Sequence, residues 1–171
     1  ISRGQAGGYT LILPEKDRTL ISRNKMLADM VSMLGGRAAE EIVFSDITSG
    51  AANDLERVTS MARKMVKRLG MSDELGPMVY GKKDELVFLG KELSEQRDYS
   101  ESIAEKIDAE VKQLVSNSYR KAKELLDQYR QELDNVAERL LEQETVTQEE
   151  LDEIFPVPNS KNAGMPIKNN A

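Results

Sequence analysis

The stretch Thr48-Ser49-Gly50-Ala51-Ala52-Asn53-Asp54-Leu55-Glu56-Arg57-Val58-Thr59 joins a turn of small residues to a strongly amphipathic segment. Apolar residues then recur at the spacing of one helical face, namely Leu55, Val58, Ala62, Met65, Val66 and Leu69. We therefore expect a helix over about residues 51–69. Gly70 is in the place of the left-handed residue that commonly follows a helix end.

Asp54 falls in the first turn of this predicted helix. An acidic residue there interacts favourably with the positive end of the helix dipole, by a few tenths to about 1 kcal/mol. The dipole is therefore a sufficient structural explanation for Asp54. By itself, a lone aspartate in this place does not indicate a metal site.

The composition excludes several classes of function. The 171 residues are 39% hydrophobic and 32% charged, with a net charge of −6, which argues against nucleic-acid binding because phosphate contacts need clustered Lys and Arg. The sequence has no cysteine and no histidine, so a Ser-His triad or an imidazole or thiolate metal site cannot come from this chain alone. A phosphate-binding G-x-x-x-x-G-K-[ST] loop is absent. No apolar run approaches the roughly 20 residues that span a bilayer, so we expect this fragment itself to be soluble.

Two further elements are predicted before the amphipathic segment. Gly8 to Leu13, ended by Pro14, is typical of an edge strand, which is either purely structural or able to pair with an extended peptide. Ser22 can cap a helix to about Val43, with Leu27, Met30, Val31 and Leu34 on its apolar face. Gly35-Gly36 within it indicates a helix end or a close backbone approach. The pattern alone favours surface carboxylates at Glu40 and Glu41, since an ionised glutamate is rarely buried unpaired.

The C-terminal half is also predominantly helical in its pattern. Residues 78–80 and 86–89 flank a polar tip and predict a short hairpin or irregular β-loop. Helices are expected over about 100–129 and 131–143, packed as an antiparallel hairpin. A capping-box pattern at Thr147 opens a short helix through Ile154, and residues 156–171 predict a disordered tail. The apolar stripes are typical of core or subunit interface.

Several motifs follow one another in order along the chain. They are Gly-Gly-Tyr-Thr with Leu-Pro over 7–14, Leu-Gly-Gly-Arg-Ala-Ala-Glu-Glu at 34–41, Thr-Ser-Gly-Ala-Ala-Asn-Asp-Leu-Glu-Arg at 48–57, Met-Ser-Asp-Glu-Leu-Gly-Pro at 71–77, Val-Phe-Leu-Gly at 87–90 and Tyr-Ser at 99–100. Together they resemble the FtsH family of membrane-anchored, ATP-dependent zinc metalloproteases. The resemblance covers residues 1 to about 155 and implies the C-terminal part of the peptidase domain. The fold expected is thus mainly α: a helical zincin-type fragment with one edge strand, a short β-loop and a helical hairpin.

The resemblance also implies roles for particular residues. Family members bind zinc through the two histidines of an H-E-x-x-H helix and a distant aspartate, which corresponds to Asp54. Glu40 resembles a carboxylate that orients a zinc-bound histidine, a partner that fixes the imidazole tautomer. Asn53 and Thr48 are expected to shape the turn before Asp54. The strand residues Tyr9, Thr10, Leu11 and Ile12 resemble the edge of the substrate cleft.

The H-E-x-x-H motif itself does not occur in this sequence. We therefore expect a cut piece of a larger protein, with no catalytic residue of its own, that neither holds zinc nor cleaves polypeptides alone. The parent implied is a homo- or hetero-hexamer in a bacterial inner membrane or an organelle membrane. Its peptidase domain faces the cytosol, matrix or stroma, and ATP and Mg²⁺ bind an ATPase module. The alternative, from another functional class, is a non-catalytic helical assembly module or a pseudoprotease; an intact or substituted H-E-x-x-H motif upstream of Ile1 would separate the two.

Overall fold

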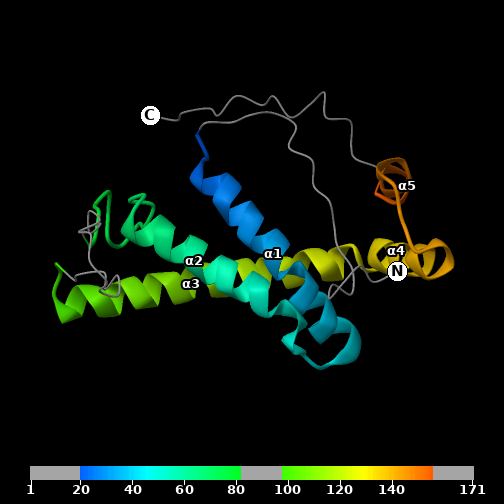
Figure 1. The fold of residues 1–171 in the computed structure, drawn as a ribbon, viewed down its shortest axis with the longest axis horizontal. Coiled ribbons are helices and arrows are strands. Elements are labelled where there is room, and N and C mark those ends of the chain that lie inside the picture. Colours follow the sequence, from blue (N-terminus) through cyan, green and yellow to red (C-terminus); the bar gives the residue numbers. More distant parts are fainter. Residues whose placement is uncertain (1–19, 82–97, 156–171) are drawn as a thin grey trace, which may run out of the picture. The chain divides into compact units, whose positions relative to one another are not determined.

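The computed structural model describes residues 20–81 and 98–155. The described chain is mainly helical, as predicted, and contains no strand (Figure 1). In order, the elements are α1 (Arg23–Phe44), the short 3-10 helix η1 (Ser49–Ala51), α2 (Ala52–Lys67), α3 (Glu101–Gln128), α4 (Arg130–Gln143) and α5 (Gln148–Ile154). The predicted edge strand over 8–13, the second arm of the β-loop and the tail after residue 155 lie outside the described residues.

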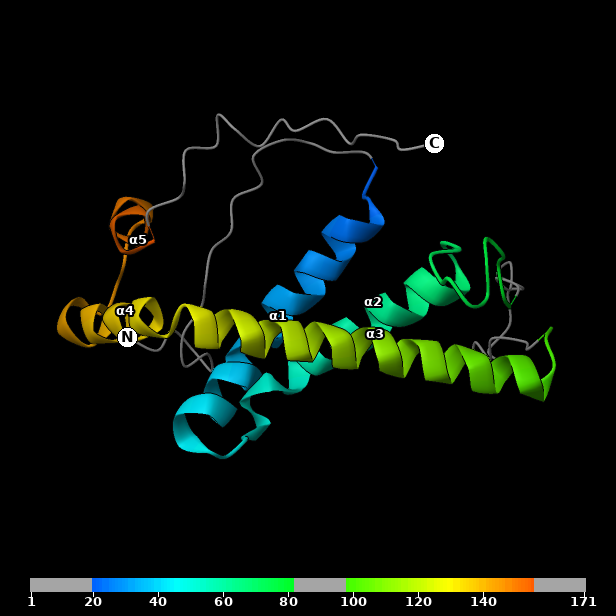
Figure 2. The ribbon, with the colours of Figure 1, turned by 180° about the vertical axis from the view of Figure 1, so that it is seen from behind.

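The chain forms two compact units. The first contains α1, η1, α2 and α3, and it holds an apolar core to which all three long helices contribute. Figures 1 and 2 show α1 and α2 leaving the turn between them at an angle, with α3 passing across both. The buried apolar side chains of this core are Met26, Met30, Leu34 and Ala38 of α1, Val58, Ala62, Met65 and Val66 of α2, and Ile107, Val111 and Ala122 of α3, together with Leu75 and Tyr80.

Helix α1 is one continuous helix through both glycines. The hydroxyl of Ser22 accepts a hydrogen bond from the Lys25 amide at 3.2 Å and so caps its N-terminus, as predicted. Within the described chain, an added Cβ at Gly35 or Gly36 would meet no atom within 4 Å. The single helix predicted over about residues 22–43 is confirmed. Among the described residues, the glycine pair marks neither a helix end nor a close backbone approach.

Helix α2 ends two residues earlier than the pattern indicates, at Lys67. Leu69 is consequently 42% exposed, because it lies beyond the helical face that enters the core. Gly70 does take the left-handed conformation predicted for it, with φ +57°. An added Cβ at Gly70 would lie 2.9 Å from Pro77 Cα, so this turn depends on glycine both for its backbone conformation and for space.

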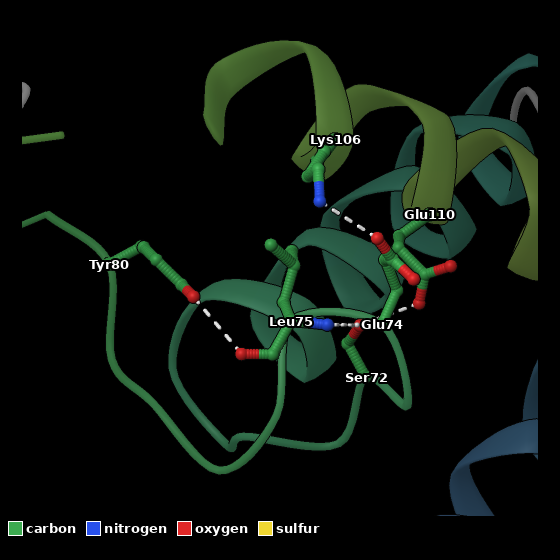
Figure 3. Close-up of polar contacts among 6 residues, drawn as sticks. All are labelled: Ser72, Glu74, Leu75, Tyr80, Lys106 and Glu110. Atoms are coloured by element: carbon green, nitrogen blue, oxygen red, sulfur yellow. Dashed lines mark hydrogen bonds and ion pairs between the residues drawn. The ribbon is translucent and has the colours of Figure 1, made fainter. Parts of the chain in front are cut away.

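The segment that follows α2, residues 71–81, is an irregular loop that packs on α3 (Figure 3). The Ser72 hydroxyl accepts a hydrogen bond from the Leu75 amide at 3.0 Å and donates one to the Glu110 carboxylate at 2.6 Å. Lys106, one turn earlier on α3, pairs with Glu74 at 2.9 Å. The phenol of Tyr80 donates to the Leu75 carbonyl at 3.0 Å and closes the loop from within. The loop therefore joins the C-terminal end of α2 to the first half of α3.

The second unit contains α4 and α5, whose bounds agree with the predicted helices. The capping box at Thr147 is confirmed, with Glu150 as its reciprocal partner. The rings of Tyr129 and Phe155 lie 6.2 Å apart, but neither helix buries a side chain, and Leu141 is 85% exposed. The antiparallel packing predicted for the helices over about 100–129 and 131–143 stays a prediction. None of the helices in the described ranges is both long enough and apolar enough to cross a bilayer.

Replacement of Gly70 by alanine tests this account of the turn. We expect Gly70→Ala to destabilise the purified chain by at least about 1–2 kcal/mol, the cost of a left-handed L-residue, plus the contact with Pro77. The matched control is Gly36→Ala, for which we expect stabilisation by up to about 1 kcal/mol because the site is open and helical. Urea unfolding followed by circular dichroism measures both. Equal effects of the two substitutions would contradict the account.

Candidate functional site

The candidate site lies at the reversal of the chain between α1 and α2. Helix α1 ends when Ser45 enters the left-handed region at φ 54°, and its amide donates to the Glu41 carbonyl at 3.0 Å. The Asp46 carboxylate accepts from the Ile47 amide at 2.7 Å. The chain then passes through Thr48 and η1 directly into α2. This reversal places the end of α1 against Thr48 and η1, from which α2 begins.

Glu40 organises this reversal. One oxygen of its carboxylate accepts a hydrogen bond from the Thr48 amide at 3.1 Å, and the other accepts one from the Thr48 hydroxyl at 2.9 Å. The same hydroxyl accepts from the Gly50 amide at 3.1 Å and caps η1. Hydrogen bonds to an ionised carboxylate are stronger than those between neutral groups. The turn is therefore fixed by a charged residue eight positions earlier, and the role predicted for Thr48 in shaping it is confirmed.

Asp54 follows this turn, in the first turn of α2. The N-cap residue of α2 is Ala51, which is buried and offers no side-chain hydrogen bond to the helix start. The Asp54 carboxylate lies 3.5 Å from the Arg57 guanidinium, and the two side chains are 44% and 61% exposed. Exposed pairs of this kind contribute at most about 1 kcal/mol. The carboxylate is accordingly accessible and only weakly paired.

Glu41, the neighbour of Glu40, contacts α3 instead of the turn. Its carboxylate accepts a hydrogen bond from the Tyr119 phenol on one oxygen and pairs with Lys123 at 2.8 Å through the other. The Lys123 and Tyr119 hydrogen bonds hold the pKa of the Glu41 carboxyl below its ordinary value, a shift that burial opposes and the charge of Arg37 slightly assists. Burial, followed by the hydrogen bond to Glu41, raises the pKa of Tyr119. We call Glu41, Tyr119 and Lys123 the Glu41 cluster.

The described residues offer Asp54 as a possible metal ligand but do not form a complete metal site. Asp54 offers an accessible carboxylate oxygen, a donor that zinc accepts. Among residues 20–81 and 98–155, however, no three His, Cys, Asp or Glu side chains gather as a metal site would require. Any metal held by Asp54 therefore needs ligands from elsewhere, and imidazole ligands from outside this histidine-free sequence.

Comparison with known proteins identifies the family of this chain. Residues 1–154 match the family model described as Peptidase family M41. The chain belongs to this peptidase family. The M41 chain is 57% identical over 156 residues to the ATP-dependent zinc metalloprotease FtsH of Thermotoga maritima, an alignment that covers 91% of this chain and 26% of that protein.

Other relatives carry the same name. The FtsH protein of Kosmotoga olearia is 54% identical over 163 residues, which are 95% of this chain and 25% of that protein. FtsH 1 of Sphaerobacter thermophilus is 44% identical over 169 residues, 98% of this chain and 26% of its own length. The resemblance to the FtsH family is thereby confirmed. The M41 chain spans about a quarter of the length of these relatives.

The structure brings together some of the residues singled out from the sequence. Glu40, Thr48 and Asp54 lie along one chain reversal, whereas the predicted substrate-edge residues Tyr9, Thr10, Leu11 and Ile12 lie outside the described residues. The sequence pattern did not predict the contacts of the Glu41 cluster, because Tyr119 and Lys123 lie 78 and 82 positions after Glu41 in the chain. The four-residue spacing of Tyr119 and Lys123 places them on one helical face, which was the only local signal.

The Glu41 cluster predicts a specific acid response. A carboxyl group with a lowered pKa in the folded state stabilises the fold fully above the unfolded value near 4.5, and this contribution is lost as the pH falls through the lower folded value. We expect Glu41→Gln to lower the melting temperature at pH 7, and the difference from the parent chain to shrink as the pH falls below 4.5.

Melting curves followed by circular dichroism across this pH range measure the response. Glu105→Gln, at an exposed carboxylate of α3, serves as the control. Its melting temperature should match that of the parent chain at every pH. A difference for Glu41→Gln that does not change with pH would contradict the assignment.

Proposed function

We propose that this chain is part of the peptidase domain of an ATP-dependent zinc metalloendopeptidase that degrades unfolded or membrane polypeptides. The observation that carries the proposal is the match to Peptidase family M41 over residues 1–154, with relatives named ATP-dependent zinc metalloproteases. The accessible Asp54 carboxylate at the start of α2 gives this proposal a site in the described residues.

Asp54 is the residue that would hold the metal. Bound zinc lowers the pKa of a coordinated water and polarises the scissile carbonyl. Asp54 would contribute a charged oxygen ligand, since its long contact with Arg57 involves only one of its two carboxylate oxygens. Because α2 begins directly after η1, the position of Asp54 follows the conformation of residues 48–51.

Glu40 would act beside Asp54 and would not bind the metal itself. An ionised carboxylate has about four acceptor positions on its two oxygens, and Thr48 occupies two of those on Glu40. The remaining acceptor capacity suits the N–H of a zinc-bound imidazole supplied from outside this sequence. Glu40 would thus fix the turn before Asp54 and orient a second ligand at once.

The proposal extends to the whole protein. Polypeptide substrates would pair with an extended edge formed by Tyr9, Thr10, Leu11 and Ile12, since an exposed strand can accept one more strand. ATP and Mg²⁺ would bind a module outside this chain, and the protein would assemble as a hexamer at a membrane. The relatives' names support the dependence on ATP and the action on polypeptides. The substrate edge, the hexamer and the membrane location are proposed from the resemblance to the FtsH family.

Substitution of Asp54 tests the function in the whole protein. We expect Asp54→Ala to weaken zinc binding by more than about 100-fold, because a direct ligand matters more than an outer partner. Peptidase activity should fall with it. Glu56→Ala, which removes an exposed carboxylate from the same helix, is the matched control and should retain zinc. Zinc content is measured by atomic emission after dialysis.

Two results of this experiment would contradict the proposal. Unchanged zinc content in Asp54→Ala would exclude the metal role of Asp54. Absence of zinc and of peptidase activity from the unsubstituted whole protein would favour the alternative, a helical module that keeps the scaffold without the chemistry.

A further inference from the structure

Helix α1 is fixed by apolar packing along most of its length, but not at its last turn. Its buried side chains are Met26, Met30, Leu34 and Ala38, and no residue of α1 after Ala38 is buried. Phe44, the final helical residue, is 73% exposed. The turn that carries Glu40 and Glu41 therefore lies beyond the apolar core and needs another source of order.

The two adjacent glutamates of this turn contact different elements. Successive helical residues point about 100° apart around the axis, so one side chain can reach the chain reversal and the other α3. Glu40 accepts both of its hydrogen bonds from Thr48. Glu41 accepts from Tyr119 and Lys123 of α3, and its backbone carbonyl accepts the Ser45 amide that ends the helix.

The Glu41 cluster has the geometry of a fixed attachment. Each carboxylate oxygen of Glu41 receives one donor, so the group cannot rotate without loss of a hydrogen bond. The Lys123 ammonium also lies 5.8 Å from the centre of the Tyr119 ring, within the range of a cation–π contact. Tyr119 and Lys123 are four residues apart and so share one face of α3.

We propose that Tyr119 and Lys123 are positioning residues for the metal ligand Asp54 and act on it through Glu41. They fix the last turn of α1 to α3, the fixed turn directs Glu40 to Thr48, and Thr48 sets the start of α2 where Asp54 lies. The proposal rests on the metal role of Asp54 proposed above. A half-exposed ion pair adds little to global stability, so the effect of the Glu41 cluster on the site is mainly local order at the chain reversal.

Hydrogen exchange at the reversal tests the mechanical part in the whole protein. Tyr119→Phe keeps the ring and removes only the hydroxyl donor. We expect exchange over residues 45–53 to accelerate by about tenfold, the effect of losing a hydrogen bond to a charged group. Tyr80→Phe is the matched control, because it also removes one phenol hydrogen bond, to Leu75, but in the loop after α2. It should leave exchange over residues 45–53 unchanged.

A lysine pair repeats the comparison. Lys123→Met removes a 2.8 Å ion pair with Glu41, and Lys106→Met removes a 2.9 Å ion pair with Glu74 elsewhere on α3. Only the first should accelerate exchange over residues 45–53. Equal acceleration by both lysine variants, or none with Tyr119→Phe, would overturn the positioning role.

Zinc affinity tests the functional part. We expect Tyr119→Phe to weaken zinc binding by about tenfold, within the range for lost outer partners of metal ligands, while Tyr80→Phe leaves it unchanged. The outcomes separate the two proposals. Unchanged exchange or unchanged zinc affinity in Tyr119→Phe overturns the positioning role alone. Unchanged zinc content in Asp54→Ala overturns the proposed function, and faster exchange in Tyr119→Phe would then show only the coupling of Glu41 to the turn.

Discussion

The pair of hydrogen bonds from Thr48 to the Glu40 carboxylate is the interaction on which the site depends. It joins the end of one helix to the start of the next across a turn in which the N-cap residue, Ala51, cannot cap α2 with its side chain. An uncapped helix start leaves backbone amides without partners. Order at this point comes instead from the residue before η1. The Glu40 carboxylate holds Thr48 in place, and the Thr48 hydroxyl caps η1, which leads into α2.

Helix α3 connects this reversal to the rest of the first unit. Its later half contacts the end of α1 through the Glu41 cluster, and its earlier half contacts the loop after α2 through Lys106 and Glu110. The apolar core between these two polar attachments contributes most of the stability, since burial is the dominant favourable term in folding. The polar attachments instead determine where the ends of α1 and α2 lie. A site at one of these ends thereby depends on residues about 65–70 positions further along the chain than Asp54, namely Tyr119 and Lys123.

The sequence predicted the helices well, because their apolar periodicity, caps and breakers are local properties. Ser22, Thr147 and the left-handed Gly70 all appear as expected. Local pattern did not predict the contacts of Glu40 and Glu41, because a carboxylate beside apolar residues has the same pattern whether it faces solvent or a distant donor. The end of α2 at Lys67 was also missed, since Leu69 continues the apolar spacing into the turn. Asp54 looks ordinary by local physics, and only the ordered set of motifs around it singled it out.

The central claim is that Glu40 and Thr48 act as one unit in presenting Asp54 to the metal. A double-mutant cycle on zinc affinity, measured by chelator competition in the whole protein, tests it most directly. We predict that Glu40→Ala and Thr48→Val each weaken zinc binding by about tenfold or more, and that the double variant is no weaker than Glu40→Ala alone, as for residues of one network. Multiplication of the two single effects in the double variant, or unchanged affinity in Glu40→Ala, would contradict the account.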